Sequence, residues 1–394
     1  MADRLDDSRS KAKAGELMTI RYVGIGGNDS NDGLSWANRK LTLNGVEDTP
    51  VEAGDTVYVG AGTYRDAMTC DVDGSSGSPI TYIGDTDGSH TDGTGGIVRI
   101  TGTASDELSY STATLITCTK SYRTFKNLLV GQTTSHGFKV AGSYVIIENC
   151  IFTDVGTGKS YSPLYIEGTT NDAVTVRNCI FFKGLNHPTY DACINFTNGS
   201  VVNPDSGSIV ENCIFIGGYR GVHIIRWGDI TVKNCTFFRC NTGVHANISA
   251  TIDIPINVIN SLFYGCNTAI YSKVAGQMTE DYNNIDCCQT ARGNVAAGAN
   301  STAIPTNFDY RWAMEMLQNG GSLVSPFDLA SYSALINVAG TSPTPADMRG
   351  TTVQGAEREW GALEYDSTLD IEAGSGGGSG GAVSIQPLSG RLGL

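Results

Sequence analysis

The stretch VIIENCIFTDV, residues 145–155, contains the tetrapeptide Asn-Cys-Ile-Phe, which the chain repeats. The tetrapeptide returns at 178–181 and 212–215, and the related sequences Asn-Cys-Thr-Phe and Asn-Ser-Leu-Phe occupy 234–237 and 260–263. The five asparagines are separated by 29, 34, 22 and 26 residues. A minimum period of 22 residues, lengthened by variable insertions, is typical of stacked similar units that carry loops.

Each unit has the pattern of short strands. Apolar residues alternate with other residues before each asparagine, and a second segment follows a turn, as in GVHII (221–225), GVHAN (243–247) and TAIYS (268–272). Alternation with a period of two predicts strands, and no helical period lies between them. A unit of about 22 residues with three short strands corresponds to one coil of a parallel β-helix, which advances by about 4.8 Å per coil.

Stacked coils place equivalent residues in columns. Asparagine tolerates the left-handed backbone conformation, so we expect the repeated asparagines at a bend between two strands, with their amides bonded to a neighbouring coil. We expect the cysteine and the phenylalanine of each unit to point inward. One inward column comprises Cys150, Cys179, Cys213 and Cys235, continued by Ser261. A metal or redox ladder is the alternative, but we interpret these cysteines as small apolar fillers of a narrow core. Free buried thiols suit assembly in a reducing cytoplasm.

The charge balance limits the partners. The chain of 394 residues has 26 Lys and Arg against 40 Asp and Glu, a formal net charge of −14. This charge argues against nucleic acid as a partner and against anionic membranes. No stretch has the length and hydropathy of a membrane-spanning helix, and the first residues carry charges where a signal peptide needs an apolar run. We therefore expect no membrane insertion and no secretion leader.

Both ends of the repeat region resemble a known group. The stretches 21–66 and 74–85, and near the other end 333–340 and 347–366, resemble the opening and closing coils of the pectate-lyase-like β-helix superfamily. That superfamily includes the alginate lyase and chondroitinase B types and uncharacterised β-helix repeat proteins. The resemblance implies an all-β fold, a single-stranded right-handed parallel β-helix (solenoid) with short N-terminal and C-terminal arms.

We accordingly divide the chain into three parts. Residues 1–17 form an N-terminal arm, 18–366 the right-handed parallel β-helix, and 367–394 a Gly/Ser linker with a C-terminal anchoring peptide. Because an uncovered sheet edge invites aggregation, we expect caps on both ends of the β-helix. The turn at 28–33 with Trp36 is expected to cover the first coil, and Trp360 with Leu363 the last.

The lyases of this superfamily lead us to expect a Lys-Ser pair on one coil and an Arg-His-Gly sequence on a later one. Lys159-Ser160 lies in a predicted insertion, and the chain contains no Arg-His-Gly. A glycoside hydrolase would need paired carboxylates facing one groove. The coils offer Asp154, Glu167, Asp172, Asp191 and Asp229 for this role, without a recognisable pairing. We assign no catalytic residue; if the protein is an enzyme, we expect a polysaccharide lyase or a glycoside hydrolase.

The strongest candidate site is an outward stripe of polar and aromatic residues. His223 and His245 are each third in Gly-Val-His and lie 22 residues apart, so they should stack. The predicted glycan-contact or partner-contact residues are Asn195, His223, Arg226, Trp227, Asp229, His245 and Tyr271. An ordinary solvated face or a subunit contact would show the same residues.

Aspartates near glycines raise the question of a metal. Asp29, Asp32, Asp71 and Asp73 have side chains that could bind calcium. Aspartate next to glycine is more often part of a turn, and we predict no cofactor.

Two functions remain open. The first is a structural component of a phage-type virion, on the capsid or the tail, that binds other virion proteins through 1–17 and 367–394 and assembles in the host cytoplasm. The alternative is an extracellular carbohydrate-active enzyme or glycan-binding β-helix. A homotrimer and a host polysaccharide are further partners to test. We favour the virion component.

Overall fold

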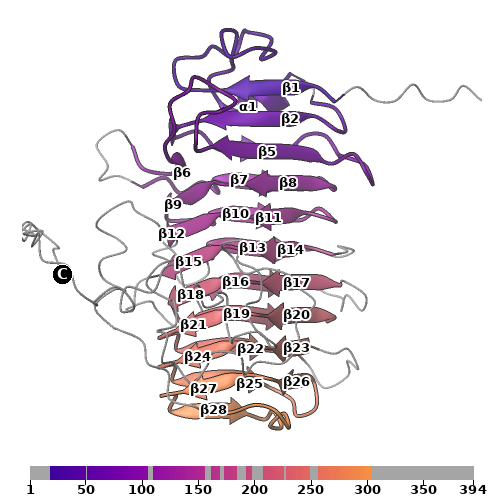
Figure 1. Cartoon of the computed structure of the whole chain (residues 1–394), viewed down its shortest axis with the longest axis vertical. Coiled ribbons are helices and arrows are strands. Elements are labelled where there is room, and N and C mark those ends of the chain that lie inside the picture. The colour runs from indigo at the N-terminus through magenta and orange to yellow at the C-terminus, as the bar shows by residue number, and fades with distance from the viewer. Residues whose placement is uncertain are drawn as a thin grey trace, which may run out of the picture.

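The chain folds into a parallel β-helix built from three sheets, A, B and C (Figure 1). The computed structural model describes residues 18–49, 51–104, 110–155, 161–168, 173–183, 192–197, 207–225, 228–248 and 256–303. Successive coils contribute one strand to each sheet, and neighbouring strands pair in parallel register. The predicted fold class, an all-β parallel solenoid, is confirmed.

The strands have the following bounds. Sheet A consists of β1 (Ile20–Val23), β2 (Thr56–Gly60), β5 (Ile80–Asp85), β8 (Arg123–Lys126), β11 (Ile146–Glu148), β14 (Thr175–Arg177), β17 (Ser208–Glu211), β20 (Ile230–Lys233), β23 (Ile256–Ile259) and β26 (Met278–Asp281). Sheet B consists of β3 (Gly62–Tyr64), β6 (Val98–Thr101), β9 (Leu129–Thr133), β12 (Ile151–Val155), β15 (Ile180–Lys183), β18 (Ile214–Gly217), β21 (Thr236–Phe238), β24 (Leu262–Tyr264) and β27 (Asn284–Asp286). Sheet C consists of β4 (Met68–Thr69), β7 (Ile116–Cys118), β10 (Phe138–Val140), β13 (Leu164–Glu167), β16 (Ala192–Thr197), β19 (Arg220–Ile225), β22 (Thr242–Ala246), β25 (Thr268–Ser272) and β28 (Thr290–Gly293).

The repeated asparagines lie at the corner between sheets A and B, as predicted. The five repeated asparagines, together with Asn127 one coil earlier, have left-handed backbone conformations with φ between 49° and 59°: Asn127, Asn149, Asn178, Asn212, Asn234 and Asn260. The side-chain nitrogen Nδ2 of Asn212 donates to Oδ1 of Asn178 in the preceding coil (3.3 Å). Asparagine is favoured here because it tolerates the bend and supplies a bond between coils.

The core contains the two predicted inward columns. Phe152, Phe181, Phe215, Phe237 and Phe263 stack face to face, with ring centroids 4.8, 5.1, 4.6 and 4.7 Å apart. The cysteine column is free and buried, and Ser261 continues it. Burial raises the pKa of the Cys150 and Cys213 thiols, which favours the protonated form. The interpretation as core fillers agrees with this environment.

A short helix covers the N-terminal end of the core. Helix α1 (Leu43–Glu47) buries Leu43 and Val46. Trp36 packs over Gly60 of β2, where an added Cβ would lie 2.4 Å from the indole ring. Trp36 thus contributes to the cap as predicted, whereas the helix was not foreseen.

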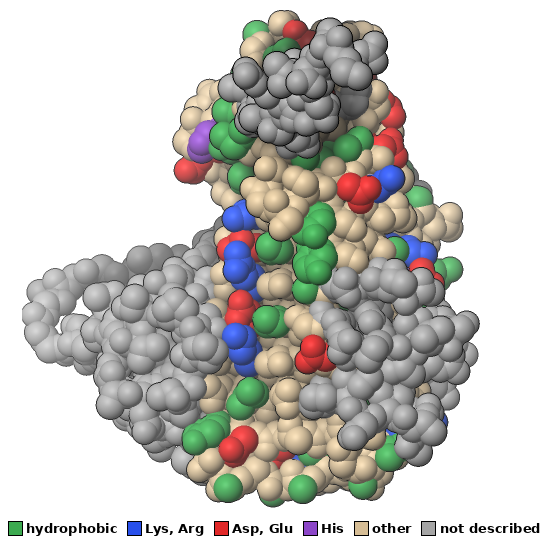
Figure 2. Space-filling model, turned by 90° about the vertical axis from the view of Figure 1, so that its right-hand side faces the viewer, with side chains coloured by type: hydrophobic (Ala, Val, Ile, Leu, Met, Phe, Trp, Pro, Cys, Tyr) green, Lys and Arg blue, Asp and Glu red, His purple; other side chains and the backbone are tan. Residues whose placement is uncertain are grey.

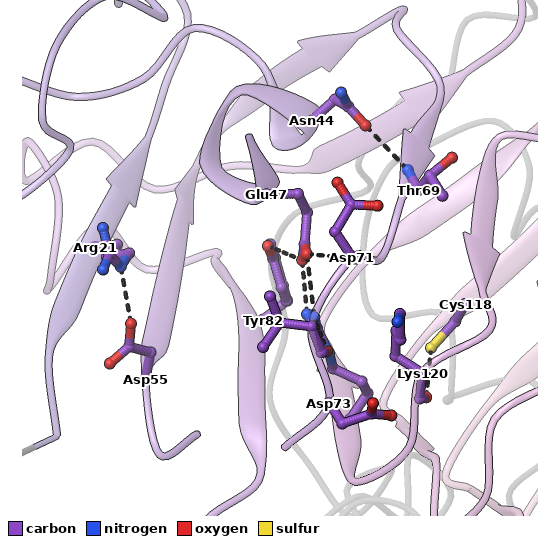
Figure 3. A network of polar contacts seen from close by, with 12 residues as sticks. Arg21, Asn44, Glu47, Asp55, Thr69, Asp71, Asp73, Tyr82, Cys118 and Lys120 are labelled. Carbon is purple, nitrogen blue, oxygen red and sulfur yellow. Dashed lines mark hydrogen bonds and ion pairs between the residues drawn. The ribbon is translucent and has the colours of Figure 1, made fainter. Parts of the chain in front are cut away.

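A buried ion pair joins this cap to the coils behind it. Glu47 of α1 accepts from Arg123 of β8 (Nη1 to Oε1, 2.6 Å) and from the hydroxyl of Tyr82 of β5 (2.5 Å). The Asp71 backbone amide donates to the same carboxylate (3.0 Å; Figure 3). The Glu47 and Arg123 side chains are both fully buried. A charge so deeply buried is tolerated only when it is paired and hydrogen-bonded.

Several predictions fall outside the described residues. They concern the two arms, residues 1–17 and 367–394, and the C-terminal cap formed by Trp360 and Leu363. The arms and this cap therefore stay predictions. Within the described part of the chain, no helix is long and apolar enough to cross a membrane.

Candidate functional site on sheet C

The outer face of sheet C carries one continuous column of polar and aromatic side chains. Strand register places Asn195, His223, His245 and Tyr271 on successive strands, as the spacing predicted. The column extends further toward the N-terminus through Tyr165 and Lys139, which the sequence analysis did not identify. We call these six residues the sheet C column.

The centre of the column contains buried polar atoms without hydrogen bonds. His223 is only 5% exposed, and among the described residues neither of its ring nitrogens has a hydrogen-bond partner. In the preceding coil, Oδ1 of Asn195 is also buried and has no partner within the described part of the chain. Each such group costs about 1–3 kcal/mol when no partner is supplied. Other described residues, Arg177 and Gln277 among them, also have a buried atom of this kind, but His223 has two and lies directly beside Asn195 in strand register.

The histidines of the column are neutral near pH 7. Burial, together with the charge of Arg220 and the proximity of His245, lowers the pKa of His223 to about 2. Burial and Arg220 lower the pKa of His245 to about 4. A neutral imidazole offers one donor and one acceptor, so His223 presents both kinds of group.

Arg220, at the start of β19, positions His245. Its Nε donates to Nδ1 of His245 (3.0 Å), which assigns the His245 proton to Nε2. The Arg220 guanidinium also lies 4.9 Å from the centroid of the Tyr219 ring. The sequence analysis missed Arg220, because its position next to the histidine depends on the path of the chain at the corner before β19.

Aromatic rings flank the polar centre on both sides. His136 stacks on Tyr165 with centroids 4.2 Å apart, and His245 lies 4.7 Å from Tyr271. Lys139 pairs with Glu167 (2.5 Å), so this lysine is already neutralised. Burial lowers the pKa of His136 to about 4. The column therefore presents hydrogen-bonding groups at its centre, between the rings of Tyr165 and Tyr271.

Asp229 does not belong to the column, and its predicted place beside His223 is wrong. It lies in the turn before β20 with φ of 51°, and its carboxylate accepts from the Gly207 amide (2.9 Å). The chain turns away from sheet C before this residue, so Asp229 stabilises a corner. Arg226 and Trp227 lie outside the described residues, and their roles stay predictions.

The outer face of sheet A differs from sheet C. Figure 2 shows a column of alternating basic and acidic side chains on that face. Register places Lys126, Glu148, Arg177, Glu211 and Lys233 in this column. The ion pairs Lys126–Glu148 (3.0 Å) and Arg177–Glu148 (3.1 Å) link adjacent coils. These charges are paired with one another, which makes sheet A a suitable control surface.

Three of the four aspartates considered for calcium accept backbone hydrogen bonds. Asp29 accepts from the Leu41 and Thr42 amides, Asp32 from Leu34, and Asp73 from Ser121. Of the described residues, one group has ligand atoms that all lie within 4.8 Å of one another, and it comprises Asp85, Asp87 and His90. Asp85 already accepts from the His90 amide and the Thr91 hydroxyl.

The Lys159-Ser160 pair lies outside the described residues. A second Lys-Ser pair, Lys120-Ser121, was overlooked in the sequence. It occupies the corner between β7 and β8, where Ser121 Oγ accepts from the Ser143 amide (3.1 Å). This pair is used in the turn and is not part of the sheet C column.

Comparison with known proteins identifies the repeat region. Residues 114–285 match the family described as "Right handed beta helix region". The match spans the coils that contain the sheet C column and confirms the predicted right-handed solenoid. A search of curated proteins gave no match.

Two solved structures are similar over most of the β-helix. Pectate lyase Pel9A is 17% identical, with a TM-score of 0.56, covering 88% of this chain and 96% of that chain. The GH136 lacto-N-biosidase from Eubacterium ramulus is 11% identical, with a TM-score of 0.51, covering 68% of this chain and 56% of that chain. At these identities the likeness shows the fold alone, and it confirms the resemblance to pectate-lyase-like β-helices.

Proposed function

We propose that the protein is a glycan-binding β-helix whose sheet C column binds a polysaccharide chain. The observation that carries this proposal is the pair of buried, unpartnered groups at His223 and Asn195. A sugar hydroxyl both donates and accepts, so adjacent hydroxyls of one ring can satisfy an amide oxygen and a neutral imidazole together. Supplying these bonds removes the desolvation cost that the free protein carries.

The rest of the column suits a chain-like ligand. Asn195, His245 and Tyr271 are partly exposed, and His223 lies between two of them. The unpartnered atoms of His223 and Asn195 are themselves buried, so a sugar hydroxyl reaches them only by displacing neighbouring side chains. Tyr165 and Tyr271 offer ring faces of the kind that pack against the apolar face of a sugar. Five steps of about 4.8 Å give a surface roughly 24 Å long, which is long enough for several sugar units.

We propose binding in preference to eliminative cleavage. A uronate lyase needs a base that accepts the α-proton and a cation that neutralises the carboxylate. Arg220 could serve as the cation, but a pKa of about 2 makes His223 a weak base. A catalytic base works best when its pKa lies near the working pH.

The virion hypothesis is less well supported than its carbohydrate alternative. Pectate lyase Pel9A and the GH136 lacto-N-biosidase, both similar with TM-scores above 0.5, are carbohydrate-active enzymes. Attachment through the arms, a homotrimer, and a virion or extracellular location stay predictions.

The test is binding of the purified full chain to polygalacturonate, alginate and xylan by affinity electrophoresis. We expect retardation by at least one glycan, and at least tenfold weaker binding for His223→Ala combined with His245→Ala. The control is Lys126→Ala combined with Glu148→Ala, which removes the Lys126–Glu148 and Arg177–Glu148 ion pairs from sheet A without changing net charge. Circular dichroism verifies folding, and ultraviolet absorbance of unsaturated uronate reports cleavage. No retardation by any glycan, or equal loss in both double variants, would overturn the proposal.

A further inference from the structure

A polar hollow lies at the corner between sheets B and C. It has a volume of about 290 Å³ and is lined by Gly218, Tyr219, Arg239, Asn241, Gly265 and Asn267, with Cys240 behind them. These residues belong to three successive coils, immediately before β19, β22 and β25. We call this hollow the corner pocket.

Two stacked amides form one wall of the corner pocket. Nδ2 of Asn267 donates to Oδ1 of Asn241 in the preceding coil (2.6 Å). This bond orients both side chains, and it leaves Nδ2 of Asn241 as a donor and Oδ1 of Asn267 as an acceptor. The pocket therefore presents a fixed donor and a fixed acceptor on adjacent coils.

The floor and the opposite walls leave room for a ring. Gly218 and Gly265 have φ of 82° and 65°, a conformation that favours glycine and keeps side chains out of the hollow. The Tyr219 ring and the Arg239 side chain line the remaining sides. An aromatic ring beside paired amides matches the two faces of a sugar, one apolar and one carrying hydroxyls.

The corner pocket adjoins the sheet C column. Tyr219 lines the pocket, and its ring lies 4.9 Å from the Arg220 guanidinium. Arg220 in turn donates to His245 of the column (3.0 Å). The side chains of Tyr219 and Arg220 thus connect the pocket with His245 of the column.

We propose that the corner pocket binds one pyranose unit of the same glycan through two vicinal hydroxyls, one accepting from Asn241 and one donating to Asn267. The inference rests on the proposed function of the sheet C column. It places the glycan across the corner between sheets B and C at the coils of His223 and His245, instead of only along the column.

The test compares oligosaccharides of increasing length, taken from whichever of polygalacturonate, alginate or xylan the wild-type protein binds. Calorimetry gives the dissociation constant for each length. We expect the wild-type affinity to increase at the length that reaches the corner pocket. Asn241→Ala combined with Asn267→Ala should lose about 3- to 10-fold at and beyond that length, the range expected for one or two hydrogen bonds, and nothing for shorter chains.

The matched control is Asn257→Ala. Asn257 also forms a side-chain bond between coils, accepting from the Thr279 hydroxyl (2.6 Å), but it lies on sheet A. If the pocket variant binds every length as the wild type does, while the variant of His223 and His245 loses binding, only the corner pocket inference is wrong. An equal loss at all lengths would also overturn it. If no glycan binds the wild type, the proposed function fails, and this inference fails with it.

Discussion

Nε of Arg220 donates a hydrogen bond of 3.0 Å to Nδ1 of His245 in the next coil. The bond connects the corner before β19 with the outer face of sheet C. It places a positive charge beside two histidines and lowers the pKa of both. Burial is the larger cause of both lowered pKa values, and Arg220 adds to it while it orients the ring of His245.

Arg220→Met should raise the pKa of His245 from about 4 toward its ordinary value of 6.5. The substitution removes the neighbouring charge and keeps a side chain of similar length. The pKa of His223 should rise as well, because Arg220 contributes to its lowering. Titration of the histidine ring protons by nuclear magnetic resonance measures both values, with Lys126→Met as the control on sheet A. An unchanged or lower pKa of His245 would contradict this account.

Stability should decrease as the pH falls from 7 to 5. The unfolded chain binds protons at histidine below pH 6.5, whereas folded His245 stays neutral down to about 4. The unfolded state therefore binds more protons in this window, and the free energy of unfolding falls with pH. His245→Gln should reduce this fall by about 1 kcal/mol, allowing for partial exposure. Urea denaturation of both proteins at pH 7 and pH 5 measures the difference. An equal fall in the free energy of unfolding for both proteins would refute the assignment.

Cys213→Ser should be tolerated with a loss of about 1 kcal/mol or less. At the equivalent position, the Ser261 hydroxyl donates to the Ile259 carbonyl (2.9 Å), and Cys213 Sγ makes the same contact with Glu211 (3.2 Å). Cys213→Val, which branches within a closely stacked column, should cost about 1–3 kcal/mol by overpacking. Denaturation with urea ranks the two variants. A serine variant less stable than the valine variant would show that the thiol is more than a core filler.

Glu47→Gln should destabilise the N-terminal cap by about 3–5 kcal/mol, because it leaves the buried Arg123 without its counter-charge. Lys126→Met, which opens a partly exposed pair on sheet A, should cost about 0–1 kcal/mol. The double variant Glu47→Leu with Arg123→Met should cost less than the two single changes together, since no charge is left unpaired. Thermal denaturation tests this order. Equal effects at the buried and the exposed pair would contradict it.

Much of the candidate site followed from spacing alone. His223 and His245 lie 22 residues apart with no insertion between them, so their alignment could be predicted. Tyr165 and Lys139 belong to the same column but were missed, because insertions of different length separate their coils and hide the register. Asp229 was misplaced for the same kind of reason, since the chain leaves sheet C between it and His223.

The sequence by itself determined the coil, the bend and the inward residues. These properties are local, because alternation along a strand decides which side chains point inward and asparagine tolerates the left-handed corner. Only the tertiary structure decided which outward and end residues meet. Glu47 and Arg123 are 76 positions apart, and the unpartnered state of His223 depends on everything packed around it. Contacts of this kind arise from the register and closure of whole coils, which no short stretch of sequence specifies.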